Sequence, residues 1–111
     1  MFIYAFTTLH SLEKNENNYA RFRIKTKTTA GTFVIKDITN GNNRSNLVGT
    51  QTVNWIVNNT ASTSSYRAPN NTNESIGVDK ADIWAGSTKL FDDVNVETGT
   101  QTITDLKFVI S

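Results

Sequence analysis

Apolar and polar residues alternate with a period of two along most of this chain, and this alternation constrains its fold more than any other feature. The stretch YARFRIKT at residues 19–26 is the clearest case, since every second residue from Ala20 onward is apolar or β-branched. Successive side chains of a β-strand point to opposite faces of a sheet, so this period predicts strands with one buried face. A helical period is not sustained over any full window. The sequence therefore predicts an all-β protein.

Clusters of Asn, Gly, Ser and Thr separate the alternating segments and predict the loops. The predicted strands are residues 2–9, 19–26, 32–39, 52–58, 64–68, 75–78, 81–85, 88–91 and 102–110. The predicted loops are residues 13–18, 40–46, 58–63 and 69–73. Strands at this spacing favour an antiparallel two-sheet β-sandwich of the jelly-roll type. Because the chain has no internal repeat and no long linker, residues 1–111 are expected to form a single domain.

Composition supports this fold and excludes several classes of function. The chain has 17 Thr and 14 Asn residues, which favour strands and turns respectively. Its formal net charge of +1 argues against a nucleic-acid or anionic-membrane partner. The absence of cysteine excludes disulfides, thiolate zinc sites and cysteine nucleophiles, and the single histidine, His10, has no partner at a recognisable spacing. We therefore expect a protein that is not an enzyme.

The opening run MFIYAF is apolar, but it is shorter than a signal-peptide core or a membrane span. The chain itself is therefore expected to encode neither export nor membrane insertion. An extracellular or cell-surface location would require an address in sequence outside this chain.

The polar phase of YARFRIKT is the first candidate binding surface. Tyr19, Arg21 and Arg23 fall together on it, and Lys25 continues the stripe. An arginine side chain offers a planar fork of donors that can bind sugar hydroxyls or the carboxylates of an acidic polysaccharide. The other interpretation is an ordinary solvated outer face, which antiparallel sheets commonly have.

The two tryptophans fall in different patterns. Trp55 shares its phase with Val53 and Val57, so it is predicted to lie in the core. Asp82 and Trp84 instead share the phase opposite to three small apolar residues, which predicts an exposed indole beside a carboxylate. A sugar ring could stack on that indole while the acid accepts hydroxyl hydrogen bonds. The alternative is that a loop covers Trp84 and buries it.

The segment FDDVNVE places Asp92, Asp93 and Asn95 close together, and such oxygen-rich clusters are typical of calcium sites. The spacing is not that of an EF-hand loop, and an acidic turn without a metal is the alternative interpretation. The same carboxylates do not define a glycosidase pair, because sequence gives no separation across a cleft.

The order of these segments, from FIYAFTTLHSLEKNENNYARFRIKT through GTFVIKDITNGNNRS and DKADIWAGSTKLFDD to TDLKFVIS, resembles a LamG-like, concanavalin-type jelly-roll module of secreted Bacteroidetes proteins. Such modules are usually longer, so the resemblance implies a truncated copy or a smaller sandwich. It also implies a non-catalytic polysaccharide-binding module, attached to a larger parent protein and active outside the cell. Under this resemblance the candidate ligand contacts are Tyr19, Arg21, Arg23, Asp82 and Trp84, and the candidate calcium ligands are Asp92, Asp93 and Asn95.

A second hypothesis comes from a different functional class. A Thr- and Asn-rich sandwich of low net charge also suits a structural subunit of a surface layer, a filament or a phage particle, which would form a homo-oligomer. A hydrolase ranks last, because no acid–base pair or nucleophile can be defended.

Overall fold

The computed structural model describes residues 19–37, 40–100 and 103. These residues form eight β-strands, which are β1 (Phe22–Thr26), β2 (Thr32–Asp37), β3 (Asn43–Val48), β4 (Val53–Val57), β5 (Ser64–Arg67), β6 (Asn73–Ile76), β7 (Lys80–Ala85) and β8 (Thr88–Asn95). The segments 2–9 and 102–110, also predicted to be strands, lie outside the described residues except for Ile103. The described part contains no helix long and apolar enough to cross a membrane.

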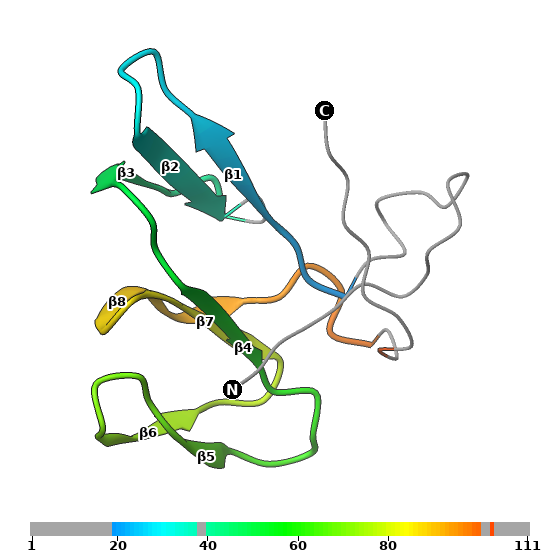
Figure 1. The fold of residues 1–111 in the computed structure, drawn as a ribbon. Helices are drawn as coiled ribbons and strands as arrows, with labels where there is room; N and C mark the ends of the chain where they lie inside the picture. Colours follow the sequence, from blue (N-terminus) through cyan, green and yellow to red (C-terminus); the bar gives the residue numbers. More distant parts are fainter. Residues whose placement is uncertain (1–18, 38–39, 101–102, 104–111) are drawn as a thin grey trace.

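The strands form three antiparallel sheets that lie in layers (Figure 1). The outer sheet has the order β1-β2-β3, the central sheet has the order β4-β7-β8, and β5 and β6 form a hairpin. Figure 1 shows the outer sheet above the central sheet and the hairpin below it. The prediction of an all-β, antiparallel sandwich is confirmed, and the hairpin adds a layer on the far face of the central sheet.

The main core lies between the outer and central sheets, and its residues follow the predicted alternation. Trp55 is buried and makes an edge-to-face contact with Phe22, at 4.7 Å between ring centroids. Ile83 and Phe91 from the central sheet and Ile35 from the outer sheet are buried in the same cluster. Trp55 therefore has the core position that the sequence predicts.

A smaller apolar cluster covers the opposite face of the central sheet. Ile56 and Trp84 point to this side and pack against Ala68, Ile76 and Tyr66, which come from the β5–β6 hairpin or its immediate flank. Because the hairpin lies on this face, both phases of β4 and β7 are buried. Only a strand buried on both faces gains from apolar residues in both phases, as the sequence WIV at residues 55–57 has them.

β3 and β8 differ most from the sequence prediction. β3 occupies most of the segment 40–46 that was predicted as a loop, because pairing with β2 overrides its turn-forming composition. β8 continues past Phe91 to Asn95, and its pairing with β7 contains register shifts. Asp93 has a φ of +50°, which re-aims the strand within the acidic segment.

The inward face of β1 is only partly covered. Phe22 packs on the core, but Ile24 is 51% exposed. Figure 1 shows that β1 diverges from the central sheet toward its end, so the later part of the strand has less cover from that sheet. The alternation in YARFRIKT predicts one buried face for this strand, and at Ile24 that prediction is wrong.

Candidate functional site

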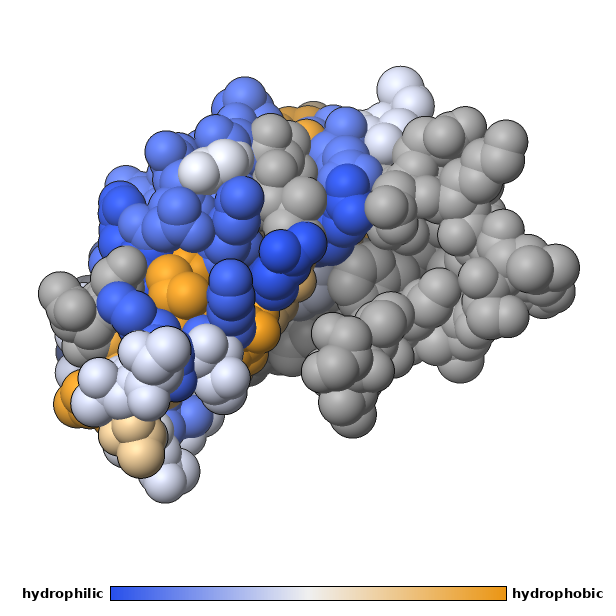
Figure 2. Space-filling view, turned by 90° about the horizontal axis from the view of Figure 1, so that it is seen from above, coloured by the Kyte–Doolittle hydropathy of each residue, from blue (hydrophilic) through white to orange (hydrophobic). Residues whose placement is uncertain are grey.

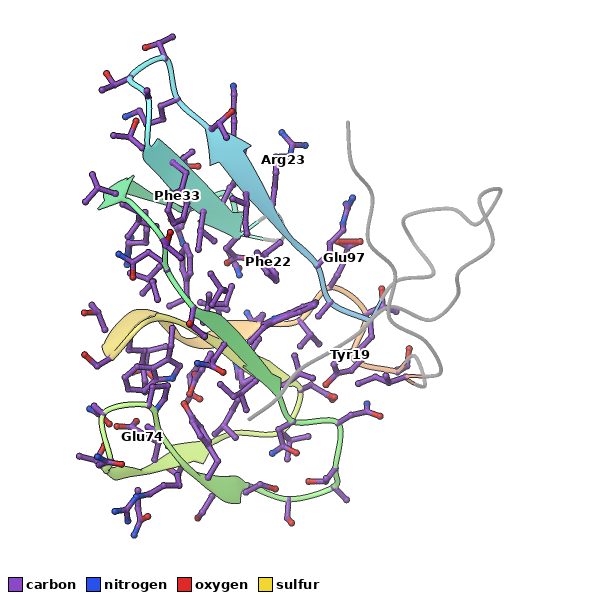
Figure 3. All side chains as sticks on the ribbon, viewed as in Figure 1. Tyr19, Phe22, Arg23, Phe33, Glu74 and Glu97 are labelled. Atoms are coloured by element: carbon purple, nitrogen blue, oxygen red, sulfur yellow. The ribbon has the colours of Figure 1, made fainter. Side chains whose placement is uncertain are left out.

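The outward face of the outer sheet carries a row of cations, and we call it the basic face. It consists of Arg23, Lys25 and Lys27 from β1 and its end, together with Lys36 from β2. The first three alternate with residues of the inward phase, and Lys36 pairs across the sheet with Arg23. Figure 3 shows Arg23 on the side of β1 opposite to Phe22.

These side chains line an open groove of about 310 Å³. Val34, opposite Lys25, and Asn43, opposite Lys36, complete its lining. The space-filling view from above the outer sheet shows that hydrophilic residues dominate the visible coloured surface (Figure 2). The groove is thus open and lined mainly by charged side chains, and it is accessible to a ligand that lies along the sheet.

The electrostatics of the basic face are unbalanced. Among the described residues, no carboxylate lines the groove and no ion pair involves its four cations. Four ammonium or guanidinium groups on one small surface repel one another, and an anionic ligand would relieve this repulsion. The arrangement can bind a ligand, but it offers no acid–base pair or nucleophile for a reaction.

The sequence predicted that Tyr19 and Arg21 lie on this face, and the structure places both elsewhere. Tyr19 is fully buried, and its hydroxyl lies 2.8 Å from Asp79 Oδ1 and 2.9 Å from the carbonyl oxygen of Asn58. Burial raises the pKa of the Tyr19 phenol above its usual value, and the hydrogen bond to Asp79 raises it further. The prediction failed because β1 begins only at Phe22, so its alternation does not extend back to Tyr19.

Arg21 is partly buried and already has an anionic partner. Its Nε lies 2.5 Å from Glu97 Oε1, on the segment that follows β8. Glu97 also donates its backbone N–H to the carbonyl oxygen of Tyr19, at 2.9 Å. Arg21 therefore fastens the start of β1 to the segment after β8, and of the three residues predicted from YARFRIKT only Arg23 lies in the groove.

Asp82 and Trp84 are buried, so the prediction of an exposed indole beside a carboxylate is wrong. Asp82 is 0% and Trp84 is 2% exposed, because the β5–β6 hairpin covers their face of the central sheet. The alternative interpretation, in which another segment covers Trp84, is therefore the one that the structure shows. In this position the indole cannot serve as a stacking platform for a sugar.

Asp82 and Trp84 belong to a buried hydrogen-bond network centred on Tyr66. The Tyr66 hydroxyl donates to Asp82 Oδ2 at 2.6 Å and accepts from Trp84 Nε1 at 2.8 Å. The backbone N–H of Asp93 donates to the other oxygen, Asp82 Oδ1, at 2.7 Å. Every buried side-chain polar atom of the described residues has a partner, which is the condition for such a network to stabilise a fold.

Lys89 brings a positive charge to the edge of this network. Its Nζ lies 2.6 Å from Glu74 Oε1, 2.9 Å from Asp92 Oδ1 and 3.7 Å from Asp82 Oδ2. It also lies 5.5 Å from the centroid of the Trp84 ring. Figure 3 shows Glu74 on the hairpin side of the central sheet, so Lys89 links the two layers electrostatically.

The ionisable groups here have shifted pKa values. Burial raises the pKa of Asp82 above its usual value, although hydrogen bonds from Asp93 and Tyr66 and the charge of Lys89 oppose the shift. Burial also raises the pKa of Tyr66, and its hydrogen bond to Asp82 adds to the effect. Burial lowers the pKa of Lys89, but Glu74, Asp92 and Asp82 outweigh it and the net shift is upward. Lys89 is therefore a cation throughout the physiological pH range.

The carboxylate cluster differs from the predicted calcium set. Oxygens of Asp82, Asp92 and Asp93 lie within 4.8 Å of one another, whereas Asn95 instead accepts a hydrogen bond from Lys80. Asp82 thus replaces Asn95 in the only such group found among the described residues. A divalent ion there would compete with the Lys89 ammonium group, which already contacts Asp92.

The sequence pattern predicted that Arg23 and Lys25 lie on one polar face, but it did not predict that Lys27 and Lys36 join them on the basic face. The signal for Lys36 was present in TFVIKD, where it shares a phase with Thr32 and Val34. What the sequence lacked was the pairing of β1 with β2, which places Lys36 directly opposite Arg23.

Comparisons with protein-family models, curated proteins and solved structures find no match to this chain.

Proposed function

We propose that this protein is a non-catalytic polysaccharide-binding module whose ligand lies along the basic face. The observation that carries the proposal is the open groove lined by Arg23, Lys25, Lys27 and Lys36, whose lining contains no carboxylate among the residues that the structure describes. Exposed guanidinium and ammonium groups donate hydrogen bonds to sugar hydroxyls and carboxylates without first losing an internal partner. The resemblance of the sequence to LamG-like modules agrees with this role.

Recognition of this kind is weak at a single site. Each direct hydrogen bond contributes about 1 kcal/mol net, and an exposed groove excludes little water. Useful affinity then comes from attachment to a larger parent protein that binds the same polymer at several points. An extracellular or cell-surface location follows from such a ligand.

Affinity electrophoresis of the isolated chain in gels that contain different polysaccharides tests the proposal. We expect retardation in at least one gel and a smaller retardation for the Arg23→Gln variant. Arg67→Gln is the matched control, because Arg67 is exposed on β5 and its loss changes the net charge equally. Parallel gels with calcium and with a chelator test whether the Asp82, Asp92 and Asp93 cluster contributes through a metal. Equal retardation of wild type and Arg23→Gln would place the ligand elsewhere.

The second candidate function is that of an assembly subunit, and the distribution of charge favours it. Residues 19–48 contain six basic residues and one acidic residue, whereas residues 49–100 contain three basic and six acidic residues. A basic face and an acidic region on one chain are complementary, so one copy could bind the next head to tail. Analytical ultracentrifugation at low and high salt tests this: a subunit would form oligomers that dissociate as salt is added, and a binding module would sediment as a monomer.

A further inference from the structure

We propose that the ligand of the basic face is a polyanion of the polysaccharide class, that is, a chain carrying carboxylate or sulfate groups at regular intervals. This inference rests on the proposed function and specifies its ligand. It follows from three properties of the basic face, which are the linear arrangement of its cations, their chemical type and the absence of aromatic side chains among the described residues of its lining.

The cations are arranged as a row and not around a point. Arg23, Lys25 and Lys27 follow one another at every second residue, which spaces them about 7 Å apart along an extended strand. Lys36 lies beside Arg23 on the neighbouring strand. A single small anion would need several donors that converge on it, whereas a row of separated donors matches a polymer with repeated charges.

The type of cation also matters. Three of the four groups are lysines, whose compact ammonium heads act as point charges on flexible stems. Such groups respond to the charge of a ligand more than to the direction of its hydroxyl groups. A neutral sugar would not change the electrostatic repulsion among these cations, whereas an anionic sugar would reduce it.

The rest of the groove does not fit a nucleic acid. Binding of single strands depends on aromatic side chains on which bases stack, and among the described residues the groove lining consists of the four cations, Val34 and Asn43. A flexible, unstacked polyanion such as a uronate or sulfated glycan suits the basic face better.

Titration calorimetry of the whole chain with dextran and dextran sulfate isolates charge on one backbone, and polygalacturonate supplies the carboxylate alternative. We expect binding to dextran sulfate, to polygalacturonate or to both, no heat with dextran, and weaker binding as salt rises, because exposed charges are screened. The variant Lys25→Gln/Lys27→Gln/Lys36→Gln should lose about tenfold in affinity. The variant with arginine at the same three positions should recover most of the loss, and Arg67→Gln should bind as wild type does.

The outcomes separate the two proposals. Binding of neutral dextran that is insensitive to salt would overturn the charge inference and leave the binding module intact. Failure of every polysaccharide to bind would overturn both. Equal affinity for a single-stranded oligonucleotide of similar length would also overturn the inference, because the basic face would then select any polyanion.

Discussion

The hydroxyl oxygen of Tyr66 lies 2.6 Å from Asp82 Oδ2, and this hydrogen bond joins the β5–β6 hairpin to the central sheet. The same oxygen accepts the indole N–H of Trp84. One phenol thus satisfies two buried polar groups whose exposed fractions are at most 2%. Since an unpaired buried polar group costs more than a paired one gains, Tyr66 is central to the attachment of the hairpin.

Replacement of Tyr66 by phenylalanine should lower the free energy of unfolding by about 1–3 kcal/mol, because the Trp84 N–H loses its acceptor and Asp82 Oδ2 loses a donor. Urea denaturation followed by circular dichroism measures the change. Ser65→Ala is the control, as Ser65 is exposed on the same strand, and it should shift stability by less than about 0.5 kcal/mol. A Tyr66→Phe variant as stable as wild type would show that the network does not hold the hairpin.

The raised pKa of Asp82 predicts a pH dependence of stability. A carboxyl group with a higher pKa in the folded state binds its proton more tightly there than in the unfolded chain. Its contribution is therefore fully present below the unfolded pKa of about 3.9 and is lost as pH rises through the folded pKa. The groups facing it are the Tyr66 hydroxyl, Asp92, Asp93 and the Lys89 cation.

Asp82→Asn isolates this contribution, because asparagine does not titrate. The difference in unfolding free energy between wild type and Asp82→Asn should move against wild type as pH rises from about 4, and then level off. Denaturation at a series of pH values measures it. A difference that stays constant with pH, or that moves in favour of wild type, would contradict a raised pKa.

Asn71 has a φ of +66° in the turn between β5 and β6, where its N–H donates to the carbonyl oxygen of Ala68. Residues with a Cβ are disfavoured in this region by about 1–2 kcal/mol, and asparagine tolerates it better than most. Asn71→Ala should therefore destabilise the protein by about 1 kcal/mol, while Asn71→Gly should be close to neutral. Thermal melts of both variants check this, and equal melting temperatures for the two would refute the turn conformation.

Both indoles are buried, and their fluorescence should report it. Trp55 is 6% and Trp84 is 2% exposed. Iodide should quench the native protein only slightly and the urea-unfolded protein strongly, because iodide does not penetrate a packed interior. Trp55→Phe leaves Trp84 as the single tryptophan. Strong quenching of that native variant would show that the Trp84 indole is exposed, as the sequence predicted.

The sequence predicted β4 and β7, two of the three strands of the central sheet, well, because they carry strong local patterns. β4 and β7 were found within a residue or so of their true ends, and Trp55 was placed in the core. β3 was missed because NRSNLV has a polar, turn-forming composition and becomes a strand only through pairing with β2.

The candidate site was harder to predict, for a physical reason. Alternation says that Asp82 and Trp84 share a face, but it cannot say whether another layer covers that face. The covering hairpin lies between β4 and β7 in the sequence, and its own strands are mostly polar on the outside. Likewise, the partnership of Arg21 with Glu97 spans 76 positions in the chain and follows only from the tertiary arrangement.

The layered arrangement assigns core packing and ligand binding to different side chains. Because the central sheet is enclosed on both sides, the side chains on which folding depends do not include those that line the groove on the outermost layer. Outward positions of β1 and β2 can thus be exchanged with little penalty to the interior. A scaffold of this kind is free to acquire a new specificity by surface substitution alone, and it is a practical starting point for engineered binders.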